Sequence, residues 1–384
     1  MRIVMTRSNP VNPDPRVEKE LNTLLKYGYD LQILAWERNV GRDVEKRDVV
    51  SLDNGNVKID LFYKEALFGR GIINLWSLLL FQFFLLKKLI HYRREYDVIH
   101  ACDFDTVIPA FIVSKMLRKK YVYDVFDYYV DAFRVPTILK PVIEGLDIQM
   151  LNQADAVIIV NESRIEQIRK SVPKSLWIIH NSPDRLPIAN CGFVPMGSMT
   201  KRLKFVYVGV LSKSRFLFEI AEVLSTFESA ELHIGGFGDL ESYFKEQSVV
   251  HDNIFYYGKL DYESALALAE HCDVMLAIYN PLVPNHRFSS PNKLYEAMLL
   301  KKPIIVAEHT GIDEIIVANH TGFVIAYDKL SFMTLIEQLL QTNPSVFQEM
   351  GIRSHRLYVE KYAWSIMGER LTSLYEGLQK RNDK

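Results

Sequence analysis

Short runs of β-branched and other apolar residues alternate with longer helical patterns along nearly the whole chain of 384 residues. Such alternation is typical of parallel β-strands joined by crossover helices. A stretch rich in proline, glycine and serine between Asn181 and Lys204 divides the runs into two series. The expected strands are Ile3–Thr6, Leu31–Trp36, Asp97–His100, Tyr121–Val125, Ala156–Val160 and Trp177–Ile179, then Phe205–Val208, Glu231–Ile234, Asn253–Tyr257, Val274–Ile278 and Pro303–Val306. We therefore predict an α/β fold with two similar-sized domains in tandem.

The length of the chain also indicates two domains, because an ordinary domain contains roughly 150 residues. We place them at residues 1–183 and 204–362, with a hinge at 184–203. The final segment carries an apolar stripe at helical spacing, formed by Trp364, Met367, Leu371, Leu374 and Leu378. A helix with one apolar face must pack against another part of the protein. At the other end of the chain, Asp14 and Pro15 are suited to begin a helix that Gly28 ends.

Composition excludes several functions. The 46 lysines and arginines balance 47 aspartates and glutamates, so no overall positive field attracts nucleic acid. Three cysteines (Cys102, Cys191 and Cys272) lack the C-x-x-C spacing of zinc sites, and their odd number argues against a disulfide framework. The apolar run after Arg2 spans only three residues, too few for a secretory signal. We expect a cytoplasmic protein with no nucleic-acid partner.

The strongest local motif runs from Phe288 to Leu300, where Ser290 is suited to be an N-cap and Pro291 a first helical residue. The free N–H groups and the dipole of such a helix start attract phosphate, and Lys293 adds a positive charge. Glu296, further along the helix, offers a carboxylate that accepts two hydrogen bonds from a vicinal diol such as a ribose. The alternative is a well-capped amphipathic helix without a ligand.

A second motif begins at Phe205 as a buried strand, ends at Gly209 and continues into a loop with Lys213 and Arg215. Doubly wound sheets bind ligands at this end of their strands, and two cations on one such loop suit a diphosphate. The alternative is a solvated surface turn. The sequence Gly-Gly-Phe-Gly at 235–238 permits close backbone approach but lacks the spacing of a dinucleotide motif.

Taken together, these segments resemble the retaining GT-B glycosyltransferases of family 4. The resemblance covers nearly the whole chain and rests on the order and spacing of short motifs. They are Asp14-Pro-Arg-Val-Glu-Lys-Glu, Leu25-Lys-Tyr-Gly-Tyr-Asp, His100-Ala-Cys-Asp-Phe-Asp-Thr, Tyr123-Asp-Val-Phe-Asp-Tyr-Tyr, Ile179-His-Asn-Ser-Pro-Asp, Tyr207-Val-Gly, Ser290-Pro-Asn-Lys-Leu-Tyr-Glu-Ala-Met, Lys302-Pro-Ile-Ile-Val and Tyr362-Ala-Trp-Ser.

The resemblance implies two Rossmann-like, doubly wound domains with a cleft between them. The acceptor is then held mainly by the first domain and the nucleotide mainly by the second. The helix at 363–384 is expected to cross back to the first domain. Glu296 then binds the ribose, Arg215 belongs to a basic clamp near Gly209, and the base lies near Tyr257. The diphosphate is wrapped by the stretch that contains Ser290, Pro291, Asn292, Lys293 and Leu294, through its available backbone N–H groups.

Three positions depart from the family pattern. Phe288 stands where the family has the first glutamate of its pair, and Val210 replaces an arginine that often follows the glycine of the loop. Phe126 replaces a histidine of the first-domain site. These departures affect the expected contacts with the donor sugar, whereas the residues expected to bind the diphosphate and the ribose are present.

The expected chemistry follows from charge. Arg215, Lys213 and the helix start stabilise the negative charge that develops on the departing diphosphate, so we expect no metal and no cofactor besides the donor substrate. Asp127 is a candidate for orienting the acceptor hydroxyl. The letters of a metal-binding D-x-D motif occur at Asp103 and Asp105, which we interpret as structural or acceptor-facing. Asn9 and Arg16 are expected in a loop on the acceptor side; local capping or ion pairing is the alternative for these residues.

Residues 71–86 carry no charge and precede a basic cluster that reaches residue 94. As a helix the uncharged run spans about 24 Å, less than the roughly 30 Å of a bilayer core, so we do not expect it to cross a membrane. Asn74, Ser77 and Gln82 mark one partly polar side. The segment 71–94 is either a buried domain helix or a peripheral membrane contact.

The function that we predict is transfer of a sugar from a nucleotide diphosphate sugar (UDP-, GDP- or ADP-linked) to a glycan or lipid-linked acceptor, with retention of configuration. Such a reaction belongs to cell-surface polysaccharide or glycolipid synthesis at the cytoplasmic side of the membrane. Two alternatives remain: a nucleotide-sugar epimerase of the same architecture, and a non-catalytic binding partner of this fold.

Overall fold

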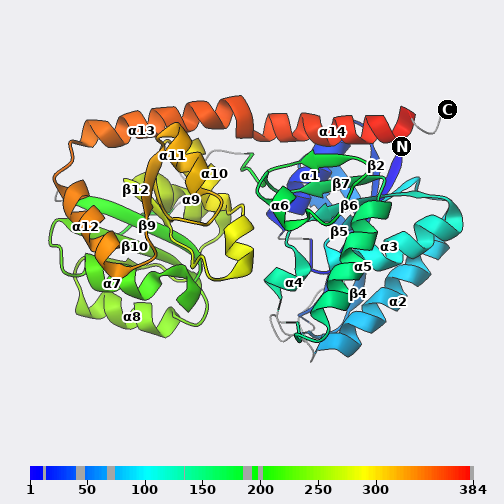
Figure 1. Ribbon diagram of the computed structural model, residues 1–384, viewed down its shortest axis with the longest axis horizontal. Coiled ribbons are helices and arrows are strands. Elements are labelled where there is room, and N and C mark those ends of the chain that lie inside the picture. Colours follow the sequence, from blue (N-terminus) through cyan, green and yellow to red (C-terminus); the bar gives the residue numbers. More distant parts are fainter. Residues whose placement is uncertain are drawn as a thin grey trace. The chain divides into compact units, whose positions relative to one another are not determined.

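The computed structural model of the protein describes residues 1–11, 14–39, 48–66, 74–133, 135–184, 193–197 and 202–380. The chain forms two compact units (Figure 1). Unit 1 contains Met1–His180 and Ser365–Lys384, and unit 2 contains Asn181–Trp364. Both are Rossmann-like α/β units built on parallel sheets, as the sequence predicted. Most of the segment that we interpreted as a hinge, 184–203, lies outside the described residues.

The sheet of unit 1 has the strand order β3-β4-β2-β1-β5-β6-β7-β8, and only the β3–β4 pair is antiparallel. Its strands are β1 (Arg2–Arg7), β2 (Asp30–Glu37), β3 (Val49–Leu52), β4 (Gly55–Tyr63), β5 (Val98–Cys102), β6 (Lys120–Val125), β7 (Ala156–Ile159) and β8 (Leu176–Ile178). Sequence analysis found six of these and missed the hairpin of β3 and β4. That hairpin lies at the sheet edge, where many residues are half-exposed or exposed and the sequence has no continuous apolar run.

One face of this sheet is covered by α2 (Leu75–His91), α3 (Phe104–Leu117) and α5 (Lys140–Gln153) (Figure 1). Two short helices, α4 (Tyr129–Ala132) and α6 (Arg164–Gln167), complete this part of the chain. The opposite face receives α1 (Pro15–Lys26) and α14 (Trp364–Lys380), which meet where Thr23 contacts Gly368. The start of α1 is as predicted, because Asp14 accepts a hydrogen bond from the Val17 N–H and Pro15 is the first helical residue.

Helix α14 belongs to unit 1 although it comes last in the sequence. Its predicted apolar stripe is buried, and Met367 and Leu371 have no exposed surface. The hydroxyl of Tyr375 lies 2.6 Å from Nδ1 of His100 on β5, and both side chains are fully buried. The helix therefore closes the core of unit 1.

The sheet of unit 2 has the order β11-β10-β9-β12-β13-β14 and all its pairs are parallel. The strands are β9 (Leu203–Val210), β10 (Ala230–Phe237), β11 (Ile254–Tyr256), β12 (Val274–Ala277), β13 (Ile304–Ala307) and β14 (Gly322–Ile325). The helices are α7 (Leu217–Leu224), α8 (Glu241–Val250), α9 (Tyr262–His271), α10 (Asn292–Leu299), α11 (Asp313–Asn319), α12 (Lys329–Leu340) and α13 (Pro344–Leu357). Sequence analysis missed β14, which starts at a glycine whose Cβ position would lie 2.2 Å from the Ile304 carbonyl oxygen.

The core of unit 1 contains a carboxyl group whose protonation makes stability depend on pH. Asp147 on α5 is 1% exposed, and one oxygen accepts a hydrogen bond of 2.7 Å from the Tyr123 hydroxyl. Burial raises the pKa of Asp147 to about 7. The folded state therefore binds a proton between about pH 4 and pH 7 that the unfolded state releases.

We expect this group to stabilise the folded state less as the pH rises from 4 to 7, by at most roughly 1.4 kcal/mol per pH unit. Asp147→Asn keeps a hydrogen-bond acceptor for Tyr123 and removes the titration. Urea unfolding of both proteins at several pH values tests this expectation. Equal pH profiles for the two proteins would show that Asp147 does not titrate in this range.

Candidate functional site

A pocket of about 300 Å³ opens in unit 2 beside the carboxyl end of β9. Two residues of that strand end, Val208 and Gly209, form part of its wall. The remaining lining comes from β9 and β12, from the start and inner face of α9, and from the first turns of α10. These residues are Val206, Met275, Leu260, Asp261, Tyr262, Ala265, Ala269, Asn292, Lys293 and Glu296. Apolar walls with a few polar groups are typical of sites for small organic ligands.

Glu296 is the acidic group on the α10 side of this pocket. The Tyr262 hydroxyl donates a hydrogen bond to its carboxylate, and burial together with this carboxylate raises the pKa of Tyr262. Tyr262 therefore stays protonated at neutral pH and holds the glutamate in place. A carboxylate has four acceptor positions, so Glu296 keeps capacity for the two hydroxyls of a vicinal diol.

Lys293 lies between Gly209 and the aromatic ring of Tyr207. Its Nζ is 4.7 Å from the centre of that ring, within the range of a cation–π interaction. A Cβ atom at Gly209 would come within 2.7 Å of Nζ, and φ at Gly209 is +149°. The positive φ therefore favours glycine at the strand end, where the lysine ammonium lies close to the backbone.

Close packing also explains the Gly-Gly-Phe-Gly sequence. At Gly236 φ is +147°, and a Cβ atom there would lie 1.8 Å from the carbonyl oxygen of Gly209 on the neighbouring strand. These glycines bring two backbones together at the pocket edge, so their role is packing between strands.

The helix start differs by one residue from the prediction. Pro291 has an extended ψ of 137° and is the N-cap, while Asn292 is the first helical residue. Proline fixes φ but leaves ψ free, so it fits either position. Ser290 does not cap the helix, because its hydroxyl pairs with the Tyr295 hydroxyl at 2.7 Å. Leu294 is buried and contributes packing.

The two loop cations differ in their surroundings. Arg215 is half-buried, with its guanidinium carbon 4.2 Å from the centre of the Tyr279 ring, whereas Lys213 is exposed. Neither side chain lines the described pocket. Tyr257 also lies outside its lining; its hydroxyl is 2.8 Å from Nδ1 of His233. Leu260 and Asp261, three and four residues later, reach the pocket instead.

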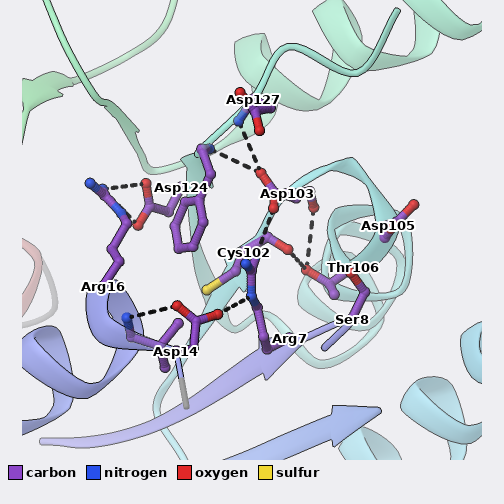
Figure 2. Close-up of polar contacts among 12 residues, drawn as sticks. Arg7, Ser8, Asp14, Arg16, Cys102, Asp103, Asp105, Thr106, Asp124 and Asp127 are labelled. Atoms are coloured by element: carbon purple, nitrogen blue, oxygen red, sulfur yellow. Dashed lines mark hydrogen bonds and ion pairs between the residues drawn. The ribbon is translucent and has the colours of Figure 1, made fainter. Parts of the chain in front are cut away.

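Unit 1 carries a polar cluster where β1, β5 and β6 end (Figure 2). Arg7 bridges two carboxylates, with 2.8 Å from Nε to Asp14 and 2.5 Å from Nη1 to Asp103. Arg16 is the second residue of α1, and so is not in a loop as we expected. Its guanidinium binds both oxygens of Asp124, at 2.9 and 3.1 Å, and is 3% exposed.

The Phe126 ring lies close to both of these arginines. The guanidinium carbons of Arg7 and Arg16 are 4.3 and 4.6 Å from its centre. The backbone N–H of Phe126 donates to Asp103 at 3.0 Å, and its carbonyl accepts from Arg164 at 2.8 Å. Phe126 is therefore held in place through both its ring and its backbone.

Asp127 is the half-exposed acid of this cluster. One of its oxygens is 3.1 Å from Arg164, and its N–H donates to Asp103 at 3.3 Å (Figure 2). Burial, with three neighbouring aspartates, raises the pKa of Asp103 to about 6 despite the attraction of Arg7. Asp105 faces Arg38 at 3.8 Å. Asn9 follows β1, and its Oδ1 is buried without a hydrogen-bond partner among the described residues.

Within the described part of the chain, one group has the composition and spacing of metal ligands: Glu20, His100 and Asp124. All three are buried, and the Arg16 guanidinium lies 3.1 Å from Glu20. Burial and the neighbouring Asp124 raise the pKa of Glu20 well above its ordinary value, although Arg16 acts in the opposite direction. Arg16 already supplies the positive charge here, so these residues fit an internal ion-pair network better than a cation site.

Sequence reasoning missed Arg7, Arg164 and Tyr262. Arg7 had a usable signal, because it directly follows the predicted strand Ile3–Thr6, as Gly209 follows the predicted strand Phe205–Val208. Arg164 and Tyr262 each lie at a helix start that no nearby motif marks as functional.

Comparisons with known proteins agree with this arrangement. Residues 202–342 match the family model "Glycosyl transferases group 1", and every residue lining the unit 2 pocket falls inside that range. The capsular polysaccharide biosynthesis glycosyltransferase CapM of Staphylococcus aureus is 24% identical over 185 residues. That match covers 46% of this chain and 47% of CapM, so the chain spans about half the length of this curated relative.

Several solved structures share the fold over almost the whole chain. Sucrose-phosphate synthase from Thermosynechococcus elongatus has a TM-score of 0.73 at 14% identity, covering 99% of this chain and 100% of that one. HepE of Anabaena, in complex with UDP and glucose, has a TM-score of 0.71 at 13% identity, covering 98% and 100%. A glycosyltransferase from Rickettsia africae has a TM-score of 0.65 at 13% identity, covering 99% of both chains. The fold is therefore the two-unit GT-B architecture.

Proposed function

We propose that this protein is a glycosyltransferase that transfers a sugar from a nucleotide diphosphate sugar to a glycan or lipid-linked acceptor. The observation that carries the proposal is the unit 2 pocket, which combines Glu296, Lys293 and the start of α10 beside a strand end. Such a group of residues suits a ribose next to a diphosphate. The family match over residues 202–342 supports the same conclusion.

Each part of the donor has a proposed partner in unit 2. Glu296 accepts hydrogen bonds from the ribose hydroxyls, and the backbone N–H groups of Ser290, Asn292 and Lys293 face the diphosphate. Pro291 has no N–H, and the Leu294 N–H donates to the Pro291 carbonyl. Arg215 and Lys213 stabilise the leaving diphosphate, which makes the reaction independent of a metal. In unit 1, Asp127 orients the acceptor hydroxyl. We further propose retention of configuration and a place in cell-surface glycan synthesis at the cytoplasmic side of the membrane, with peripheral contact through 71–94.

Glu296→Ala tests the ribose assignment. We expect at least a tenfold loss of affinity for the preferred nucleotide among UDP, GDP and ADP, which corresponds to about 1.4 kcal/mol. Calorimetric titration measures the loss, after a thermal-shift screen has identified the nucleotide. Arg215→Ala should weaken binding of the diphosphate and leave nucleoside binding unchanged. Glu263→Ala is the matched control, because Glu263 is an exposed glutamate on α9 that does not line the pocket.

Unchanged affinity in both the Glu296 and Arg215 variants would remove the proposed donor site. Product analysis separates the alternatives. An epimerase converts or releases the donor without an acceptor, whereas a non-catalytic protein binds nucleotide but gives neither transfer nor hydrolysis. Phe288, in place of the family's first glutamate, makes this second outcome worth measuring.

A further inference from the structure

Helix α2 buries one stripe and exposes a second apolar stripe. Phe81, Leu85 and Leu89 are fully buried in the unit 1 core, whereas Trp76 and Phe83 are 68% and 67% exposed. The amide of Gln82 donates a hydrogen bond to the backbone carbonyl of Asp105 and so faces the protein. The outward side of this helix is therefore more apolar than the partly polar side that the sequence suggested.

The two neighbouring helices continue this apolar surface. On α3, Ile112 and Met116 are 38% and 61% exposed, four residues apart. Val142 and Leu146 on α5 are 60% and 40% exposed, and Leu139, the residue just before this helix, is 46% exposed. Helix α3 packs between α2 and α5 in one layer over the sheet, so the three outward stripes face the same side (Figure 1).

We call this surface the three-helix face and define it by the exposed apolar residues of α2, α3 and α5, together with Leu139 just before α5. They are Leu75, Trp76, Leu79, Phe83, Ile90, Ile112, Met116, Leu139, Val142 and Leu146. Folding of unit 1 does not require them, because each helix already buries a separate stripe in the core. Soluble monomers rarely expose an apolar patch that extends over several elements, and such a patch marks a binding surface.

The charges on these helices indicate the kind of partner. Among the lysine, arginine, aspartate and glutamate side chains of α2, α3 and α5, the exposed ones are all lysines: Lys87, Lys115 and Lys140. Two half-buried acids on these helices have cationic partners, Asp105 with Arg38 and Glu144 with Lys170. Apolar stripes with lysines among them match a bilayer that carries anionic lipids, and tryptophan prefers its interface.

We propose that the three-helix face binds the surface of an anionic membrane, with α3 and α5 inserting apolar side chains alongside α2. This inference deepens the proposed function, because it gives a lipid-linked acceptor a location on the acceptor-side unit. No helix among the described residues is long and apolar enough to cross a membrane, so the contact is peripheral. The exposed stripes then insert only to the level of the headgroups and the upper acyl chains.

Vesicle co-sedimentation tests the proposal on the full chain, without nucleotide. We expect binding to phosphatidylglycerol vesicles that is at least tenfold tighter than binding to phosphatidylcholine vesicles, and that weakens as salt is added. The triple variant Ile112→Ser, Val142→Ser and Leu146→Ser should lose at least tenfold in vesicle affinity while α2 stays intact. Trp76→Phe should remove most of the blue shift in fluorescence that accompanies binding.

The matched control is Val249→Ser with Val250→Ser on α8 of unit 2, where the side chains are 86% and 66% exposed. These substitutions remove similar apolar surface and should leave vesicle binding unchanged. Nucleotide affinity, measured on all variants, should equal that of the wild type, so failure of the membrane contact is distinguished from failure of the donor site.

Two results would overturn the inference. If the triple variant binds vesicles like the wild type, α3 and α5 do not take part. Light scattering provides the second test. If the wild type does not bind vesicles but forms a dimer, and the triple variant is monomeric, the face binds a second copy of the chain instead.

Discussion

Replacing Arg16 by leucine is expected to lower the free energy of unfolding of unit 1 by about 3–5 kcal/mol. The guanidinium binds both oxygens of Asp124 and lies 3.1 Å from Glu20, and the two acids have no exposed surface. Burial by itself raises the pKa of Asp124, but Arg16 and His100 hold it below its ordinary value. Without the arginine, a buried carboxylate loses its main counter-charge.

Urea unfolding followed by tryptophan fluorescence measures this loss, because Trp36 and Trp177 both lie in unit 1. Arg2→Leu is the matched control. Its pair with Asp97 has a similar distance of 2.9 Å but lies at the surface, with side chains 43% and 34% exposed, and such pairs contribute under about 1 kcal/mol. Equal losses of stability in the two variants would show that the buried ion pairs of Arg16 contribute no more to the free energy of unfolding than an exposed pair does.

Gly236→Ala is expected to destabilise unit 2 by about 3 kcal/mol or more. The positive φ adds backbone strain of about 1–3 kcal/mol for a residue with a side chain. The methyl group would also lie 1.8 Å from the Gly209 carbonyl oxygen, and separating the backbones adds about 1–3 kcal/mol. Because Gly209 forms part of the pocket wall, the same substitution should weaken nucleotide binding.

Calorimetric unfolding and nucleotide titration measure the two effects. Gly258→Ala separates strain from crowding, because Gly258 has a φ of +68° but no atom within 4 Å of its Cβ position. We expect a loss of only about 1–2 kcal/mol there and unchanged nucleotide affinity. Equal losses in both variants would contradict the close approach of β9 and β10.

The fold was largely predictable because its signals are local. Buried parallel strands such as Ala156–Ile159 are continuous apolar runs, and Asp14 with Pro15 begins α1 as the two residue types suggest. The missed strands lack that signal: β3 and β4 are half-exposed, and β14 starts at a glycine. At Pro291 the residue type fixes φ, but only the surrounding structure fixes ψ.

The candidate site was less predictable, because its side chains acquire their partners from distant parts of the sequence. Arg16 was expected on the acceptor side, with ion pairing as the alternative, but its partner Asp124 lies 108 residues away and no local pattern identified it. Arg7 pairs with Asp103, 96 residues away. The direction of a side chain such as Tyr257 or Leu260 depends on strand register and on the loop that follows. Residue spacing alone places neither one in the pocket.

Unit 1 is discontinuous in the sequence, since all of Asn181–Trp364 separates its first part from α14. A ribosome therefore finishes unit 2 before it produces the helix that covers His100 and the neighbouring carboxylates. Until that moment the nascent chain exposes an unfinished core to chaperones and proteases. A chain that stops before α14 would contain nearly all of unit 2 but would lack the last helix of unit 1. The buried contact between Tyr375 and His100 therefore forms only after all of unit 2 has been synthesised.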